Sequence, residues 1–286
     1  ILGAFEVASG IPTNYMAYIA FNVVTSIAIL AVVTLVIKFI LRPDMSKMAA
    51  ISVEQINKEE LPPMNIQQKA YVLVTILFFI FALGPSVLPA DWAITQFMND
   101  INLVGFTILA LGVLALIKVD GKPILEPVRI CKEYVMWDLY LLVVVCVFLA
   151  GSLMAPETGL REWLVGVLTP VFNAGGPLFF SVVLIVIGAL VTNVANNAIT
   201  GAILMQIIVA MGPVVGLQNQ AALAMTVCLA TFMAILTPAG SPYAAVFHSN
   251  KDKISSGEIL KYGSIMMVAG LLVYIVIGMP LANLMF

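Results

Sequence analysis

Residues 177–211 read PLFFSVVLIVIGALVTNVANNAITGAILMQIIVAM, and this stretch decides the fold. It holds two apolar runs, residues 177–191 and 199–211, on either side of a polar cluster with three asparagines. As helices, the runs would be about 22 and about 20 Å long, whereas a bilayer core is about 30 Å thick. The stretch therefore predicts a re-entrant helical hairpin with a polar tip inside the membrane. Two full spans joined by an ordinary outside loop remain the alternative.

A second interruption follows in the chain. Residues 221–236 are apolar, and the next six residues are Thr-Pro-Ala-Gly-Ser-Pro (237–242) before a short apolar piece that ends near His248. Two prolines and a glycine remove amide donors and interrupt a helix. Unwound backbone at membrane depth is tolerated only where protein or a water-filled cavity covers it. Paired interrupted helices of this kind indicate a transporter binding site.

The composition fits a lipid environment. Hydrophobic residues make up 62% of the 286 residues, charged residues 10%, and the mean hydropathy is +1.09. A soluble domain of this size would need more surface charge. Besides the hairpin and the broken helix, we expect about six transmembrane helices in an all-α membrane protein. The clearest spans are residues 14–41, 70–90, 101–119, 137–154 and 262–286.

Basic residues define the orientation, because they gather in cytoplasmic connections. Of the 13 Lys and Arg residues, all except Arg161 fall in or beside three connections that we place inside. These connections follow the first span, join the third to the fourth, and precede the last span. Both ends of the chain then face out. We expect the membrane to be a bacterial inner (plasma) membrane.

The polar residues at membrane depth are neutral. Asp, Glu, Lys and Arg occur in the proposed spans only near their ends, which argues against a proton relay in this part of the molecule. Amides, hydroxyls and freed carbonyls can replace the hydration shell of sodium, and helix N-termini attract anionic groups. No catalytic constellation is present, so we expect no enzyme, no organic cofactor and no nucleic-acid partner.

The hairpin and the break together resemble the divalent anion:sodium symporters of the ion transporter superfamily. Members carry dicarboxylates, citrate or related anions on two inverted halves, each with a hairpin tipped by Ser-Asn-Thr and a broken helix nearby. Here Asn196-Asn197-Ala198 stand at the second Ser-Asn-Thr position, and Leu236-Thr237-Pro238 resembles the Thr-Pro break. Residues 137–142, Thr158-Gly159-Leu160 and Trp163 resemble the helix before that hairpin. The similarity covers nearly the whole chain, as the C-terminal half of an inverted repeat.

The resemblance implies a site and a division of labour. Sodium would be held by Thr192, Ala195, Asn197 and Leu236, two of them through backbone carbonyls. The anionic substrate would face Asn196, Asn197, Ala198, Thr237 and Pro238. Residues 1–135 would form scaffold helices with cytoplasmic connections. Residues 136–286 would form a transport domain with the hairpin at 172–212 and the broken helix at 221–250.

Two departures from the family pattern bear on function. The tip threonine, whose hydroxyl helps to bind a substrate carboxylate, is Ala198 here. The first half of the repeat lies outside this sequence, so we expect an N-terminal remainder or a partner chain, and the resemblance implies a homodimer in the bilayer. We expect secondary active, sodium-coupled transport of a small carboxylate-type anion. The alternatives are an antiporter or arsenite-type permease of the same superfamily, and a non-transporting membrane subunit with a degenerate site.

Overall fold

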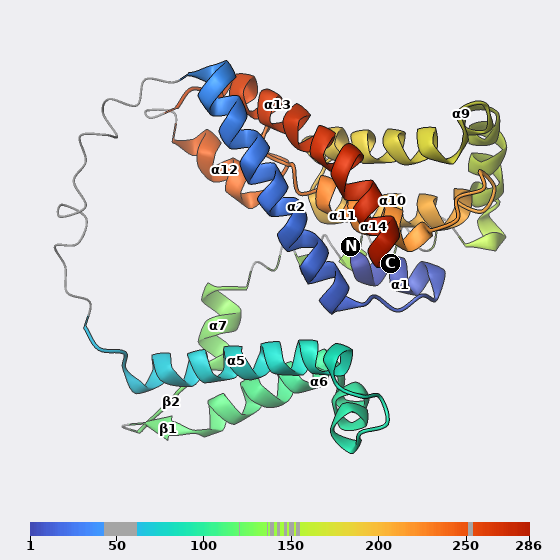
Figure 1. Ribbon diagram of the computed structural model, residues 1–286. Coiled ribbons are helices and arrows are strands. Elements are labelled where there is room, and N and C mark those ends of the chain that lie inside the picture. Colours follow the sequence, from blue (N-terminus) through green and yellow to red (C-terminus); the bar gives the residue numbers. More distant parts are fainter. Residues whose placement is uncertain are drawn as a thin grey trace. The chain divides into compact units, whose positions relative to one another are not determined.

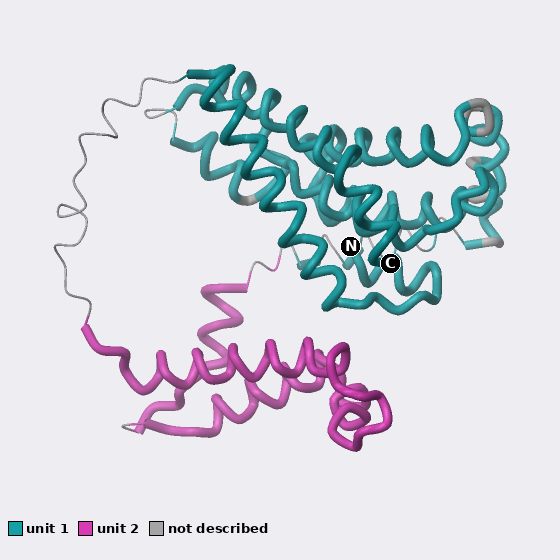
Figure 2. Tube along the Cα trace, viewed as in Figure 1, with its two compact units in different colours: residues 1–42, 138–286 teal, residues 43–137 magenta. Residues whose placement is uncertain are grey.

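The computed structural model describes residues 1–42, 62–119, 121–135, 155–250 and 254–286, with single positions between 137 and 152. The described chain is mostly helical (Figure 1). Its contacts form two compact units, one of residues 1–42 with 138–286 and one of residues 43–137 (Figure 2). Each unit is described by itself.

The larger unit contains most of the helices. They are α1 Leu2–Ser9, α2 Tyr15–Leu35 with its π-helical continuation Val36–Leu41, the 3-10 turn Pro156–Thr158, α9 Leu160–Val191, α10 Asn197–Met211, α11 Gln220–Ala230, α12 Pro242–Ser249, α13 Ser256–Val273, the π-helical Tyr274–Gly278 and α14 Met279–Met285. The smaller unit contains α5 Ile66–Val87, α6 Ala93–Leu116, β1 Lys118–Val119, β2 Lys122–Pro123 and α7 Pro127–Glu133.

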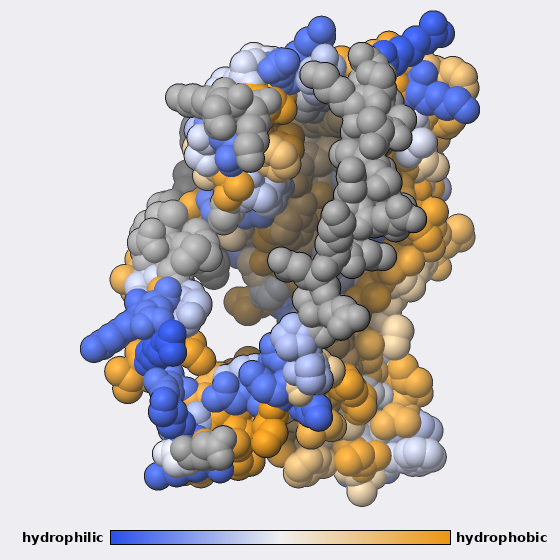
Figure 3. Space-filling model, turned by 90° about the vertical axis from the view of Figure 1, so that its left-hand side faces the viewer, coloured by the Kyte–Doolittle hydropathy of each residue, from blue (hydrophilic) through white to orange (hydrophobic). Residues whose placement is uncertain are grey.

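Four helical stretches of the described residues are long and apolar enough to cross a bilayer: Tyr15–Leu41, Ile66–Val87, Ala93–Leu116 and Ser256–Met285. Broad hydrophobic surfaces are visible on the space-filling view, as lipid-facing helices require (Figure 3). The prediction of an all-α membrane protein is therefore confirmed. The span predicted at 137–154 falls largely outside the described residues.

The helix α6 has a kink at Asn102, beside residue 101, where the third span was predicted to begin. The residues before the kink, from Ala93 on, are helical, although we predicted a connection there. Asn102 interrupts it with φ 51° and ψ 175°, and its side-chain oxygen accepts hydrogen bonds from the amides of Val104 and Gly105 at 2.9 and 3.1 Å. Asn102 thus acts as an internal N-cap, and the polar residues before it lie in a helix rather than a connection.

The core of the larger unit is built around α11. All residues of α11 from Ala222 to Ala230 are buried, because this helix is apolar on every side. Helices α9, α10 and α14 pack against it, and α1 contacts both α10 and α11. Phe180, Ile185, Met205 and Ile208 are among the buried side chains of this core.

The two short apolar runs form the arms of a helical hairpin. Helix α9 is broken at Gly176, which has φ 70° and ψ −174°, so that residues 177–191 make the first arm and α10 the second. The arms pack closely at Gly188, where an added Cβ would lie 3.2 Å from a methyl group of Leu204. The chain leaves the helical conformation between the arms, at residues 192–196.

The second interruption is also present. Helix α11 ends at Ala230, and the chain becomes helical again at Pro242, the first residue of α12. Ser241 caps α12 by accepting a hydrogen bond from the amide of Ala244 at 3.2 Å. Proline at the first helical position loses no hydrogen bond, so Pro242 can begin α12. The apolar run was predicted to reach Leu236, but α11 ends six residues earlier, so the unwound segment is longer than predicted.

The two contact units are not the two predicted domains, because residues 1–42 belong with residues 138–286. Residues 1–42 contact the later helices, with α2 packed against α13 and α1 against α10. These contacts say which helices pack together and not which of them move. The assignment of residues 1–135 to a scaffold and of residues 136–286 to a transport domain remains a prediction.

The break at Gly176 gives a first test. Its backbone conformation is accessible essentially only to glycine, so Gly176→Ala should lower the free energy of unfolding by about 1–3 kcal/mol. Thermal unfolding of the purified full-length protein in detergent would measure this. Gly166→Ala is the control, because Gly166 lies in α9 with no heavy atom within 4 Å of an added Cβ. Equal melting temperatures for the two variants would contradict the assigned break.

Candidate functional site

The hairpin tip and the helix break are joined through one side chain, Asn193. Its side chain is buried, with 3% exposed. Its amide nitrogen donates hydrogen bonds to the carbonyl oxygens of Ala189 at 2.6 Å and of Met233 at 3.0 Å. Its side-chain oxygen accepts from the amide of Leu236 at 2.7 Å, and the Thr237 hydroxyl donates to its backbone carbonyl. Asn193 thus fixes the tip against the break.

Neighbouring residues strengthen this joint between the tip, residues 192–196, and the break, residues 231–241. The Thr192 hydroxyl is fully buried and donates to the carbonyl of Thr231 at 2.7 Å. Gly240 comes so close to the tip that an added Cβ would lie 3.1 Å from the carbonyl oxygen of Thr192. The Ser241 hydroxyl donates to the carbonyl of Ala234 at 2.6 Å and so holds the unwound segment together. Carbonyls freed from the helix ladder thereby find donors in side chains.

The asparagines predicted to bind substrate have different environments. Asn196 is the N-cap of α10, and its side-chain oxygen accepts from the amide of Ala198 at 2.8 Å. Asn197 is the first residue of α10, and within the described residues its carboxamide makes no hydrogen bond. Asn196, Asn197 and Ala198 are all partly exposed. The tip therefore presents one engaged carboxamide and one that is available.

Backbone oxygens around the joint are also available. No hydrogen bond from the described part of the chain ends on the carbonyl oxygens of Thr192, Ala195 or Leu236. The Thr200 hydroxyl, one turn into α10, is 3% exposed and likewise has no partner among the described residues. Buried polar groups without partners are rare, and a bound ion is one explanation for them.

A cavity of 660 Å³ lies on the α12 side of the break, within the larger unit. Leu236, Thr237 and Pro238 line it together with His248 and Ser249 of α12. The structure thus brings three of the predicted site residues to one cavity, whereas Asn196, Asn197 and Ala198 are not in its lining. The hydroxyl hydrogens of Thr237 and Ser241 are directed to backbone carbonyls of the protein.

The joint is electrically neutral. Its polar atoms are carboxamides, hydroxyls and backbone carbonyls, and the described residues contain no group of three or more His, Cys, Asp or Glu side chains that could hold a metal ion. Such a set of ligands suits a weakly held alkali cation better than a transition metal, which prefers imidazole and thiolate.

A comparison with known families decides the identity. The family model described as the sodium:sulfate symporter transmembrane region matches residues 1–286, the full length of the chain. The chain belongs to this family of sodium:sulfate symporters. The resemblance to the divalent anion:sodium symporters is thereby confirmed. No curated protein matches the chain.

Membership sets the general activity of this symporter chain. The family carries out sodium-coupled anion transport, which makes sodium the coupling ion and places the chain among carriers rather than enzymes. The neutral joint between tip and break is compatible with that activity, because uncharged ligands can accept a cation and an anion together.

The central role of Asn193 was not predicted. The sequence showed it as one of several neutral residues at membrane depth, and we assigned it no part in the site. A carboxamide that directly follows an apolar helical run, one residue after a buried threonine, was the available signal. Its bonds reach residues forty or more positions away, which no local pattern reports.

Replacement of Asn193 tests the joint. Asn193→Leu keeps the side-chain volume but leaves the Met233 carbonyl and the Leu236 amide without partners, each costing about 1–3 kcal/mol when buried. We expect a correspondingly lower melting temperature of the full-length symporter. Asn283→Leu is the matched control, because that carboxamide is exposed and donates a single bond, to the Met279 carbonyl. A loss no greater than in the control would refute the assigned role.

Proposed function

We propose that this chain is the C-terminal half of a secondary active transporter that couples sodium to a small carboxylate-type anion, bound where the hairpin tip meets the helix break. The observation that carries the proposal is the set of polar groups left without partners at this joint. The Asn197 carboxamide and three nearby backbone carbonyls make no hydrogen bond within the described residues. Unpaired groups of this kind are costly unless a ligand completes them.

In this proposal, sodium is held by oxygen atoms of the tip and the break. Thr192, Ala195 and Leu236 contribute backbone carbonyls, and Asn197 contributes its side-chain oxygen. The Thr192 hydroxyl is already used in a bond to Thr231, so Thr192 acts through its backbone. Carbonyl oxygens on unwound backbone are the ligands that transporters use for sodium.

The anion is placed against the start of α10. Asn196 and Asn197 each offer amide hydrogens, since the capping bond of Asn196 uses only its oxygen. The positive end of the dipole of α10, a helix of 15 residues, favours a negative group at the same place. Ala198 would contact the substrate without a hydrogen bond. Thr237 and Pro238 contribute the wall of the neighbouring cavity.

The complete transporter needs more than this chain. We propose that residues 172–212 are re-entrant, that an N-terminal half or partner chain supplies an inverted second hairpin, and that the assembly is a homodimer in the inner membrane. The short arms support the first point, because the helices at Gly175–Val191 and Asn197–Met211 are both shorter than 18 residues. Sodium and substrate would then lie between two hairpin tips.

Sodium binding gives the first test of this function. A ligand at 100 times its Kd stabilises the folded state by about 2.7 kcal/mol. We expect the melting temperature of the complete purified transporter to rise with sodium but not with potassium, and to rise further with one member of a panel that includes sulfate and dicarboxylates. Asn197→Ala should abolish both responses, whereas Asn283→Ala, in an exposed position on α14, should keep them.

The possible outcomes separate the alternatives. A sodium response without an anion response, together with no solute uptake into vesicles, would indicate a non-transporting subunit. Uptake that proceeds without sodium would indicate an antiporter or arsenite-type permease. Absence of any sodium response in a well-folded sample would refute sodium coupling.

Ala198, which stands where the family has the tip threonine, gives a second test. If Ala198 stands where a hydroxyl would meet a substrate carboxylate, Ala198→Thr should tighten dicarboxylate binding by about tenfold, since a hydrogen bond to a charged group contributes about 1.5–3 kcal/mol. Competition of unlabelled anions with the transported one would measure this. Ala198→Val, which adds the same volume without a hydroxyl, is the control and should not tighten binding.

A further inference from the structure

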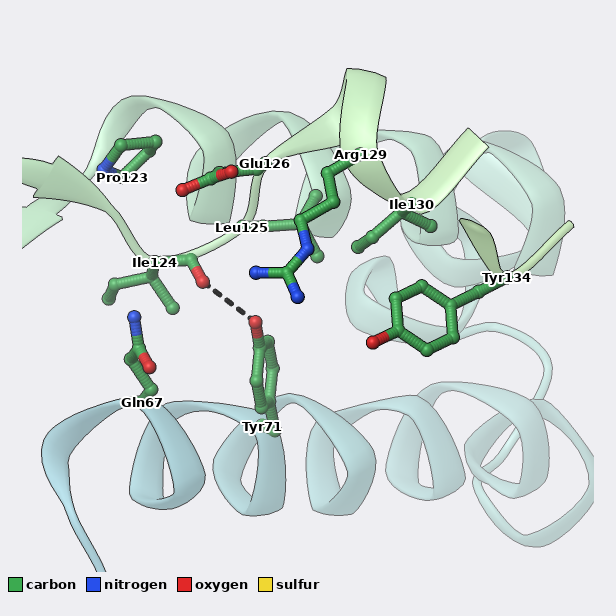
Figure 4. A pocket seen from close by; sticks show the side chains of 9 residues that line it. All are labelled: Gln67, Tyr71, Pro123, Ile124, Leu125, Glu126, Arg129, Ile130 and Tyr134. Atoms are coloured by element: carbon green, nitrogen blue, oxygen red, sulfur yellow. Dashed lines mark hydrogen bonds between the residues drawn. The ribbon is translucent and has the colours of Figure 1, made fainter. Parts of the chain in front are cut away.

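The smaller unit contains a preformed pocket at one end of the α5–α6 pair (Figure 4). Its volume is 460 Å³, and its lining combines polar side chains with the apolar Ile124 and Ile130. The Tyr71 hydroxyl donates to the Ile124 carbonyl at 2.7 Å, and the Leu125 amide donates to the Leu114 carbonyl at 3.1 Å. Ile124 and Leu125 line the pocket and form a buried cluster with Leu114. The wall of the pocket is therefore rigidly held.

Arg129 gives the pocket its charge. Its guanidinium donates through Nε to the Glu133 carboxylate at 2.9 Å. That neighbouring carboxylate raises the pKa of Arg129 further, so the side chain stays cationic. In Figure 4 the terminal nitrogens point into the pocket, with the Gln67 amide on one side and the Tyr134 hydroxyl on the other. An arginine fork beside further donors is the arrangement that binds phosphate groups.

The surroundings add positive charge. Lys132 lines an adjoining cavity of 500 Å³, and Lys122 lines another of 720 Å³. Glu126 lines the pocket itself and the cavity of Lys132, and Glu133 lines that adjoining cavity. The three cations outnumber the two carboxylates among these described residues. The region thus favours an anion over a zwitterion, because a positively charged group brought with the phosphate would meet the lysines.

The pocket lies where a bilayer surface must be. Helices α5 and α6 are both candidate membrane spans, and the pocket takes residues from the start of α5 and from the chain that directly follows α6. Tyr134 is 67% and Trp137 49% exposed in the segment that follows α7. Tyrosine and tryptophan are enriched at the membrane–water interface, and basic pockets beside spanning helices bind lipid head groups.

We propose that this pocket binds the phosphate of an anionic phospholipid from the bilayer that α5 and α6 span. The Arg129 fork, the Gln67 amide and the Tyr134 hydroxyl hold the phosphate, and the apolar wall at Ile124 and Ile130 lies against the glycerol and the first carbons of the chains. This site is independent of the sodium and anion joint, because all its residues belong to the smaller unit.

Lipid retention by the full-length protein tests the proposal. The protein is purified with mixed phosphatidylglycerol and phosphatidylcholine, and the retained lipids are counted by native mass spectrometry. We expect preferential retention of phosphatidylglycerol. Arg129→Gln should weaken its retention by about tenfold, as for loss of one charge-assisted hydrogen bond. Lys261→Gln, a basic residue of α13 whose ammonium lies over the Tyr262 ring, is the control and should retain the lipid.

A second variant should change phosphatidylglycerol retention in the opposite direction. Glu133→Gln releases the Arg129 fork from its carboxylate and removes a negative charge, so it should tighten phosphatidylglycerol retention. Equal retention of the two lipids by the unmodified protein, or equal loss in Arg129→Gln and Lys261→Gln, would overturn the proposal. So would inorganic phosphate that binds as tightly as the lipid, because the site would then serve a soluble anion.

Discussion

The buried carboxamide of Asn193 is the interaction on which the rest of the larger unit depends. Two interrupted helices bring backbone groups without helical partners into an apolar environment, where each unpaired group is costly. The Asn193 side chain bonds to the Met233 carbonyl and the Leu236 amide across the joint, and to the Ala189 carbonyl within its own arm. No hydrophobic residue could hold the tip against the break in this way. The polar residue is therefore required by the same unwinding that makes a ligand site available.

Close packing then leaves little freedom at the joint. Gly240 and Gly188 allow the break and the two arms to approach so closely that an added Cβ would be crowded, at 3.1 and 3.2 Å from its neighbours. Gly270 accommodates the side chain of Met233, which adjoins the same break. Because α11 is buried from Ala222 to its end at Ala230, its last turn is fixed before the chain unwinds. A rigid frame of this kind would hold the groups of the proposed site, at Asn197 and the nearby carbonyls, in place for a ligand.

The absence of ionised side chains from the joint has an energetic reason. A permanent charge in the membrane interior costs several kcal/mol unless it is paired, whereas carboxamides and carbonyls can be buried once they are bonded. A cation and an anion that bind together neutralise each other, so neutral ligands suffice for both. In the smaller unit, Arg129, Lys122 and Lys132 lie outside the candidate spans α5 and α6, where water lowers the cost of charge.

The sequence alone determined that the chain belongs in a membrane, that its short apolar arms surround a polar tip, and that a second interruption includes Thr237 and Pro238. These features are local, since they depend on hydropathy, helix length and the chemistry of proline. It did not show that a helical piece from Ala93 precedes the kink at Asn102, or that α11 already ends at Ala230. It also gave no sign that Asn193 bonds to Met233 and Leu236, or that α1 packs on α10. Only the tertiary structure decided these points, because a hydrogen bond or packing contact between distant residues depends on how the helices are folded together and leaves no periodic trace in the chain.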